Sequence, residues 1–501
     1  MASSQNIRDK APHRAGVVLN SLWNFAGQIS PLVLAAFAIP ILIRQLGIDR
    51  YGVLTLVWIL VGYFSLFDFG MGRAITKLLA EQVALGDLQK ASSLVWTALF
   101  CMMLLGVVFG AALYFLAPWM THSILRIPLS LQREALRCIP WLAVCVPFVT
   151  LTSGLRGILE AQQNFAVVNA LRAAMGFFNY LGPLTVLLFS HHLFPVVVTL
   201  ALGRIAACGF HFWVCYKYVP VFSQGFASSA DSFRDLLGFG SWVTVSNIIT
   251  PLMIYLDRFV IGAFISMSAV AYYAAPFDAI TKLWLIPASL AGVLFPAFSE
   301  ALAIGDRTRV MSLYERSIVS TFVILFPLVL GAVLFAHEIL RIWLGANFSS
   351  HSAVVLQIFA IGVFTNSLAN MPYALLQASG RPDLTAKIHL IEAPCYIGVL
   401  IWAIRAHGLV GAALAWTVSL SIEAAVLFFL LRSFLAPRLW ATIAVASGTL
   451  VIGCTITEML PQVLFFVACI SIFAAVTWHW NLDELLRVQL RSWLREFAIA
   501  K

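Results

Sequence analysis

Long apolar runs recur along the whole chain, and this recurrence constrains the fold more than any other feature. A run of about 20 apolar residues is long enough to cross a bilayer as a helix. Only 11% of the 501 residues are charged and 61% are hydrophobic, so the chain cannot cover such runs with polar surface as a water-soluble protein does. The abundance of apolar residues also excludes a disordered chain. We therefore expect an all-α polytopic membrane protein.

The apolar runs predict about 14 transmembrane helices, arranged as two lobes of six followed by a C-terminal pair. Their expected limits are 17–43, 51–69, 91–116, 136–158, 165–189, 194–216, 239–265, 270–297, 310–335, 352–376, 385–404, 408–431, 439–457 and 462–480. The longest hydrophilic break, rich in Ser, Ala and Gly, follows the sixth run and indicates the junction between the lobes. The expected organisation is a cytoplasmic N-terminus (1–16), an N-lobe (17–216), a cytoplasmic linker (217–238), a C-lobe (239–431), spans 13 and 14 (439–480) and a cytoplasmic amphipathic tail (481–501).

The charges in the predicted loops indicate the orientation in the membrane. An even number of spans puts both ends of the chain on one side, and most loop Lys and Arg residues lie on that side. Because cytoplasmic loops carry the excess of Lys and Arg, we expect both termini in the cytoplasm. The formal net charge of +9 is then a topological signal that also suits anionic membrane lipids. Nucleic acid is not an expected partner.

An internal repeat relates the two lobes. Leu85-Gly86-Asp87 matches Ile304-Gly305-Asp306 at an offset of 219 residues (306 − 87). Leu159-Glu160-Ala161-Gln162 resembles Leu376-Gln377-Ala378-Ser379 at an offset of 217 residues (376 − 159). A repeat of six spans keeps its orientation, so we expect parallel lobes related by a pseudo-twofold axis along the membrane normal, with a central cavity between them.

Two of the predicted helices carry a polar face on an otherwise apolar surface. The residues are Asn20, Asn24 and Gln28 in the first span and Asn247, Tyr255 and Arg258 in the seventh. Their helical spacing places them in a stripe, and Gln28 and Asn247 are equivalent in the repeat. We expect the two stripes to line the central cavity as a substrate site. The alternative is polar contact between packed helices.

Ionisable groups inside the predicted spans are few, and each one costs about 2.5–3.5 kcal/mol to insert. They are Asp68, Arg172, Arg204, Asp257, Arg258, Asp278, Lys282, Glu392 and Glu423. Arg258 and Lys282 are expected to attract an anionic substrate group, because the arginine fork can donate two hydrogen bonds to a diphosphate. Asp257 and Asp278 are candidates for ion coupling or for ion pairs. Asp278 could pair with Lys282, which lies four residues further on.

The remaining intramembrane charges are weaker candidates with two interpretations. Arg172 and Arg204 either pack between helices or face the cavity. For Glu392 and Glu423, hydrogen bonding between helices is favoured over a place in the cavity. Asp68 lies at the end of the second predicted span.

The sequence contains no recognisable motif for catalysis or for a cofactor. The eight cysteines form no CxxC pair and fall mostly within apolar runs, which predicts small buried residues rather than metal ligands. There is no Walker motif and no nucleophile elbow. We therefore expect no catalytic residue, no metal and no cofactor, and a protein that is not an enzyme.

Several short motifs follow one another in order over residues 17–430. They are Leu46-Gly47 to Tyr51-Gly52, Asp68-Phe69-Gly70-Met71-Gly72-Arg73, Asp257-Arg258-Phe259-Val260-Ile261-Gly262, Trp343-Leu344-Gly345, Leu376-Gln377-Ala378-Ser379-Gly380-Arg381-Pro382 and Gly408-Leu409-Val410-Gly411-Ala412-Ala413. Each motif is weak alone. The ordered set resembles the polysaccharide transporter family of the multidrug/oligosaccharidyl-lipid/polysaccharide exporter superfamily.

This resemblance implies a flippase of the O-antigen type. Such proteins move polyprenyl-diphosphate-linked oligosaccharide units from the inner to the outer leaflet of the bacterial cytoplasmic (inner) membrane by alternating access, for the synthesis of O-antigen, capsule or exopolysaccharide. In relatives, spans one, two, seven and eight line the cavity. Relatives that flip the peptidoglycan precursor carry arginine in span one, whereas here no charge lies between Arg14 and Arg44, so that substrate is disfavoured.

The resemblance also implies the partners of this protein. These are the lipid-linked oligosaccharide and membrane lipids, with a glycan polymerase and a chain-length regulator as further candidates. Two other functions stay open. A drug or cation antiporter could share the fold, but it would need a free carboxylate in the cavity, and the first span has none. A membrane glycan polymerase would need a large external loop, and the longest one predicted is only 117–135.

Overall fold

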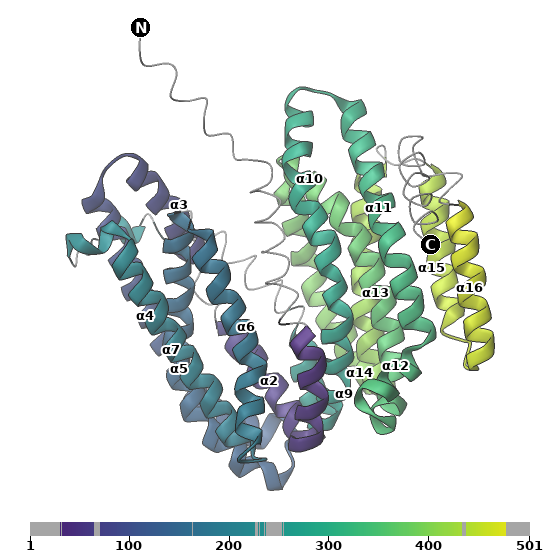
Figure 1. Ribbon diagram of the computed structural model, residues 1–501, viewed down its shortest axis with the longest axis horizontal. Helices are drawn as coiled ribbons and strands as arrows, with labels where there is room; N and C mark the ends of the chain where they lie inside the picture. Colours follow the sequence, from purple (N-terminus) through teal and green to yellow (C-terminus); the bar gives the residue numbers. More distant parts are fainter. Residues whose placement is uncertain are drawn as a thin grey trace, which may run out of the picture. The chain divides into compact units, whose positions relative to one another are not determined.

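The computed structural model describes residues 31, 33–64, 71–162, 164–225, 229, 231–234, 236, 253, 255–432 and 437–476. Every regular element in these ranges is a helix (Figure 1). Six of the described helices are long and apolar enough to cross a membrane. The all-α polytopic class is therefore confirmed, whereas the total of about 14 spans stays a prediction.

The chain forms two compact units, residues 1–271 and 272–501. The first unit contains a helix over Val33–Leu46, followed by several longer helices and two short turns. These are α2 (Ile48–Phe64), α3 (Met71–Ala84), α4 (Leu88–Trp119), the π-helical turn η1 (Met120–Ile124), α5 (Leu129–Ala161), α6 (Phe165–Leu187), α7 (Leu193–Tyr218) and the 3-10 turn η2 (Pro220–Gln224). The lobe boundaries expected from the sequence stay a prediction.

The second unit begins inside α9 (Met267–Ile280) and continues through a 3-10 turn, η3 (Thr281–Trp284). Its other helices are α10 (Leu285–Ala303), α11 (Arg307–Leu334), α12 (Ala336–Leu344), α13 (Ala346–Ala378), α14 (Pro382–Leu430), α15 (Pro437–Gly453) and α16 (Met459–Val476). α14 holds two predicted spans, because the chain reverses at Gly408 with a φ of +59° that favours glycine. α15 and α16 pack against α11 (Figure 1).

The repeat seen in the sequence is present in the local geometry of both units. Asp87 accepts the Lys90 backbone N–H at 2.9 Å at the start of α4, and Asp306 accepts the Arg309 N–H at 2.9 Å at the start of α11. The glycine before each aspartate has a positive φ, +78° and +72°. The second pair of motifs marks the ends of α5 and α13, which also begin and end 217 residues apart. The helices α4 and α11 thus start at equivalent residues, and α5 and α13 both start and stop at equivalent residues.

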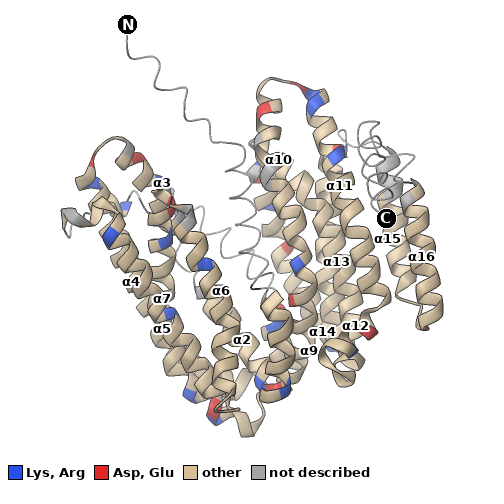
Figure 2. Ribbon diagram, viewed as in Figure 1, with Lys and Arg blue, Asp and Glu red and all other residues tan. Residues whose placement is uncertain are grey.

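Charged side chains gather mainly at the helix ends and connections (Figure 2). The long middle parts of the helices are apolar, as a membrane-spanning bundle requires. In the first unit, α3, α4, α5 and α7 share a buried core that includes Leu79, Val95 and Ile158. In the second, Phe277, Phe359 and Trp416 meet edge to face, with ring centroids 5.1–5.3 Å apart.

Glu134 joins three parts of the first unit at one end of its helices. Its carboxylate accepts the backbone N–H of Leu193, the first residue of α7, and accepts the Arg50 Nε–H at 2.9 Å. An acidic group suits this place, because the first N–H groups of a helix have no partner within the helix and carry the positive end of its dipole.

Replacing Glu134 with alanine should therefore weaken the first unit. We expect the free energy of unfolding to fall by about 1.5–3 kcal/mol, the range for hydrogen bonds to a charged group. Thermal unfolding of the purified protein in detergent measures this change. Arg133→Ala is the control, since Arg133 is exposed and adjacent. Equal melting temperatures for the two variants would contradict the role of Glu134.

Candidate functional site

Part of the predicted site lies outside the described residues. These positions are Asn20, Asn24, Gln28, Asp68 and Asn247. The polar stripe of the first span therefore stays a prediction. The same holds for Asn247 in the stripe of the seventh span. The amphipathic tail at 481–501 also lies outside the described residues.

Tyr255, Asp257 and Arg258 lie together on a helical segment of the first unit, residues 255–264. Asp257 and Arg258 are completely buried, with exposures of 0% and 1%. The Asp257 carboxylate accepts the backbone N–H of Arg258 at 2.7 Å. The Arg258 guanidinium carbon lies 5.3 Å from the centre of the Tyr255 ring, within cation–π range. A buried, oriented guanidinium of this kind is preorganised to donate to an anion.

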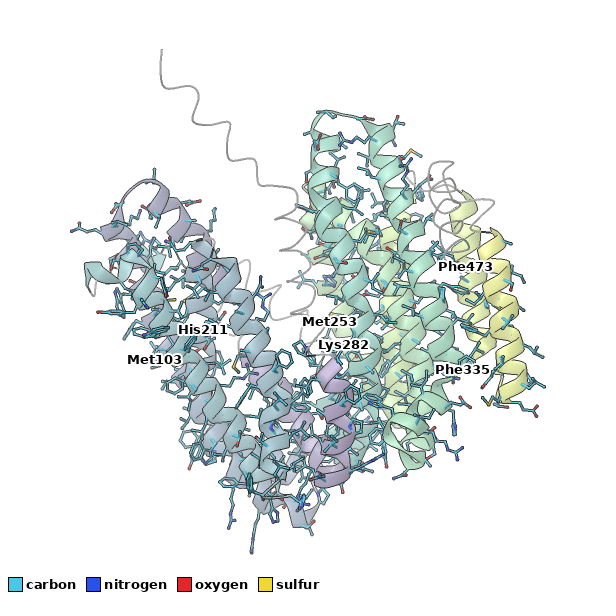
Figure 3. All side chains as sticks on the ribbon, in the orientation of Figure 1. Met103, His211, Met253, Lys282, Phe335 and Phe473 are labelled. Carbon is cyan, nitrogen blue, oxygen red and sulfur yellow. The ribbon has the colours of Figure 1, made fainter. Side chains whose placement is uncertain are left out.

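Asp278 and Lys282 belong to the second unit, where the predicted eighth span is broken. Asp278 is near the end of α9, and Lys282 lies in the 3-10 turn η3 that joins α9 to α10 (Figure 3). Lys282 is exposed. The pairing with Asp278 that the four-residue spacing suggests stays a prediction. An exposed ammonium is a point charge that an anion can approach.

The structure gives partners to both arginines of spans five and six. Arg172, on α6, lies 3.8 Å from Glu160 at the end of α5 and is half-exposed. Arg204, on α7, donates from Nη2 to the Asn179 side-chain oxygen on α6 at 3.0 Å. Both contacts join neighbouring helices of the first unit, so these two residues have structural partners whatever else they do.

Glu392 and Glu423 lie on the two halves of α14, and His389 lies between them. The Glu392 carboxylate accepts the Ser419 hydroxyl at 2.6 Å, which joins the two halves. This hydrogen bond between helices agrees with the favoured interpretation of Glu392. His389 was not among the candidate site residues predicted from the sequence. Its position three residues before Glu392 places both residues on one face of a helix.

The described site residues include two cations in different surroundings. Arg258 is a buried guanidinium and Lys282 is an exposed ammonium. That either one contacts an anionic substrate group stays a prediction. The prediction that the two share one cavity concerns residues of different units and stays a prediction. These residues could bind a phosphate-bearing ligand by charge-assisted hydrogen bonds.

Comparison with known proteins shows what this chain is similar to. Residues 17–302 match the model of the family described as "Polysaccharide biosynthesis protein". A Shigella flexneri protein named "Putative O-antigen transporter" is 28% identical over 421 residues, which cover 83% of this chain and 97% of that protein. The structure of the lipid II flippase MurJ in an inward closed conformation has a TM-score of 0.71 at 13% identity, over 91% of this chain and 99% of that one. An inward-facing multidrug resistance MATE family transporter of the MOP superfamily has a TM-score of 0.71 at 15% identity, over 80% and 93%.

The fold is that of the multi-pass membrane transporters of the MOP superfamily. The chain belongs to the polysaccharide biosynthesis protein family, because the family model matches more than half of its length. The family resemblance read from the motifs is therefore confirmed.

Proposed function

We propose that this protein is a flippase that moves polyprenyl-diphosphate-linked oligosaccharide units from the inner to the outer leaflet of the bacterial cytoplasmic membrane. The observation that carries the proposal is the match to the family model, supported by a relative named as an O-antigen transporter over almost all of its length. The flippase MurJ shares the fold. The product would serve the synthesis of a surface polysaccharide.

The mechanism we propose is alternating access by movement of two lobes around a central site. Arg258 and Lys282 attract the diphosphate, and the polar residues of spans one and seven contact the sugars. Both termini lie in the cytoplasm, so that an anion moving outward follows the inside-negative potential, which supplies about 2.3 kcal/mol per charge per 100 mV. A glycan polymerase and a chain-length regulator remain candidate partners.

Two other functions have less support. A drug antiporter is favoured by the MATE likeness, but that fold similarity equals the MurJ similarity, so the fold alone does not separate them. A polymerase needs room for catalysis outside the membrane. The longest predicted external loop, 117–135, is mostly helical, since α4, η1 and α5 leave only residues 125–128 between them.

A flipping assay with purified protein in vesicles tests the proposed function. The vesicles carry a fluorescent polyprenyl-diphosphate oligosaccharide, and an impermeant reagent reports how much of it reaches the other leaflet. We expect faster transfer than in vesicles without protein, and no transfer of a cationic dye. Movement of the dye without movement of the lipid would favour the antiporter instead.

Lys282→Ala tests the accessible charge within the same assay. Loss of one charge-assisted contact of about 1.5 kcal/mol should lower the flipping rate about tenfold. Lys387→Ala is the matched control, because Lys387 is an exposed lysine of α14 that pairs with Asp383. If the two variants flip the lipid equally well, Lys282 does not contact the substrate.

A further inference from the structure

A histidine lies between two carboxylates inside the second unit. His389 Nδ1 is 3.6 Å from Glu392 Oε2, and His389 Nε2 is 3.8 Å from Glu423 Oε1. The two glutamate side chains are about nine-tenths buried, with exposures of 11% and 10%. The imidazole ring therefore bridges a carboxylate from each half of α14.

This cluster lies within the apolar length of the helices. His389 is about two turns, or about 10 Å, from the start of α14, and Glu423 is equally far from its end. The helix start is marked by Asp383, which pairs with Arg381 and Lys387. A hydrogen bond from Arg381 holds the pKa of Asp383 below its usual value. The charges outside the membrane segment thus have partners of their own.

A cavity of about 430 Å³ opens onto the two glutamates. Its other walls come from both halves of α14 and are mostly apolar, with Ile391, Val418 and Ile422 among them. Oε2 of Glu392 is buried and accepts no hydrogen bond from the described residues, whereas its Oε1 accepts the Ser419 hydroxyl. A buried carboxylate oxygen without a donor is costly, and it marks a place where a proton can be held.

The charge of the cluster favours the binding of one positive charge. An imidazolium with two carboxylates has a net charge of −1, and such a charge is expensive inside a bilayer. One further proton makes the cluster neutral. One ring nitrogen of His389 and one oxygen of each glutamate also lie within 4.8 Å of one another, so a metal ion is an alternative occupant of the cluster. The shortest contacts of the two carboxylates go to different ring nitrogens, at 3.6 and 3.8 Å, which is longer than a hydrogen bond. Each nitrogen thus faces its own carboxylate, an arrangement that suits a proton on either side of the ring.

Among the described residues, the other titratable groups near this cluster come from α13 and α14. α13, which packs along α14, contains no Asp, Glu, Lys or Arg, and its His351 stacks on Tyr272 with ring centroids 4.5 Å apart. Tyr396 and Cys395 are the other titratable side chains that line the cavity. The remaining charged or titratable groups on α14 are Asp383, Lys387, Arg405 and His407.

The fold does not itself require carboxylates at these positions. At the offset of 217 that relates the ends of α5 and α13, His389, Glu392 and Glu423 correspond to Arg172, Met175 and Ala206. The first unit forms the helices α6 and α7 without a carboxylate at any of these positions. The acidic cluster is therefore a feature of the second unit alone, and helix packing does not account for it.

We propose that His389, Glu392 and Glu423 form an intramembrane proton-binding site whose occupancy is coupled to flipping. In the step between the carboxylates, the Nε2–H bond of the imidazolium breaks and an O–H bond forms on Glu423. The ring becomes neutral and keeps its proton on Nδ1, facing Glu392. A proton that then binds to the Glu392 carboxylate makes the cluster neutral. The imidazolium returns when the O–H bond on Glu423 breaks and that proton goes back to Nε2. Histidine and carboxylate chains serve as proton relays in transporters. The coupling rests on the proposed function, whereas the proton site does not.

The coupling is tested in the flipping assay with an imposed pH difference across the vesicle membrane. One pH unit corresponds to about 1.4 kcal/mol per proton, so we expect up to a tenfold change in the distribution of the lipid between leaflets. Glu423→Gln should keep flipping down the lipid gradient and lose the response to pH. Glu458→Gln, at an exposed glutamate, is the control and should keep the response. A response to a sodium gradient alone, or an unchanged pH response in Glu423→Gln, would overturn the proposal.

The proton site has a readout that does not depend on transport. Infrared difference spectra of the purified protein between two pH values should contain the C=O band of a protonated carboxyl group. This band should be lost or diminished in Glu423→Gln and kept in Glu458→Gln. If the band is lost in Glu423→Gln and kept in Glu458→Gln while no lipid is transferred, the proton site is supported and the proposed function is wrong. If the lipid moves but the same band is present in Glu423→Gln, the proton site is wrong and the flippase stands.

Discussion

Replacing Arg258 with alanine is expected to lower the flipping rate at least about a hundredfold. The guanidinium is completely buried next to Asp257 and lies over the Tyr255 ring. Loss of a preorganised donor to an anion costs about 2.7–4 kcal/mol, and about 2.7 kcal/mol already corresponds to a factor of one hundred in rate. The assay is the transfer of the fluorescent lipid-linked oligosaccharide, normalised to the amount of folded protein in the vesicles.

A second variant separates substrate binding from folding. Arg258→Lys keeps the positive charge but loses the fork that donates two parallel hydrogen bonds. If Arg258 contacts the diphosphate, this variant should fold and should flip the lipid slowly. Arg341→Ala removes an exposed arginine of α12 and should behave as the wild type. Full activity of a well-folded Arg258→Ala protein would exclude Arg258 from the site.

Short-range chemistry explains which parts of the fold were predictable from the sequence. The corner at Gly86-Asp87 needs only two local features. Gly86 adopts a positive φ, and the Asp87 side chain accepts the backbone N–H of Lys90, which lies in the first turn of α4 and has no acceptor within the helix. The same signals recur at Gly305-Asp306, so the repeat could be recognised without any contact between distant residues.

Two local features did not follow from hydropathy. The eighth predicted span is broken by the 3-10 turn η3, and the apolar run around it gave no sign of this break. The nine-residue helix α12 was also missed, because its amphipathic pattern is shorter than a membrane span. Both features place side chains, Lys282 and Arg341, at the ends of helices rather than within them.

The partners of the intramembrane charges depend on how helices pack, and sequence spacing does not supply that information. Arg204 meets Asn179 across two helices, and Glu423 meets His389 only because Gly408 reverses the chain. Asp278 and Lys282 have the spacing of an ion pair, but Lys282 lies in a turn where the α-helical geometry ends. The sequence therefore predicts which charged residues lie in the membrane. It does not predict which of them contact one another.

Replacing Gly106 or Gly110 with leucine is expected to separate α4 from α5 and to leave little folded protein. The two glycines form a Gly-x-x-x-Gly pattern on α4. A Cβ at Gly106 would overlap the backbone of Pro147, and one at Gly110 would lie 2.5 Å from the Ala143 carbonyl oxygen. Small residues allow membrane helices to approach this closely. The Thr150 hydroxyl also donates to the Met102 carbonyl at 3.1 Å across the same contact.

The cost should be about 1–3 kcal/mol for each substitution, because neither neighbour is a flexible side chain that can move aside. The measurements are the yield of monodisperse protein in detergent and its thermal unfolding midpoint. Gly209→Leu is the matched control, since Gly209 lies on α7 with nothing within 4 Å of an added Cβ. A Gly106→Leu protein as stable as Gly209→Leu would mean that α4 and α5 do not pack through their backbones. The first unit would then lack the close contact that positions Thr150 against Met102.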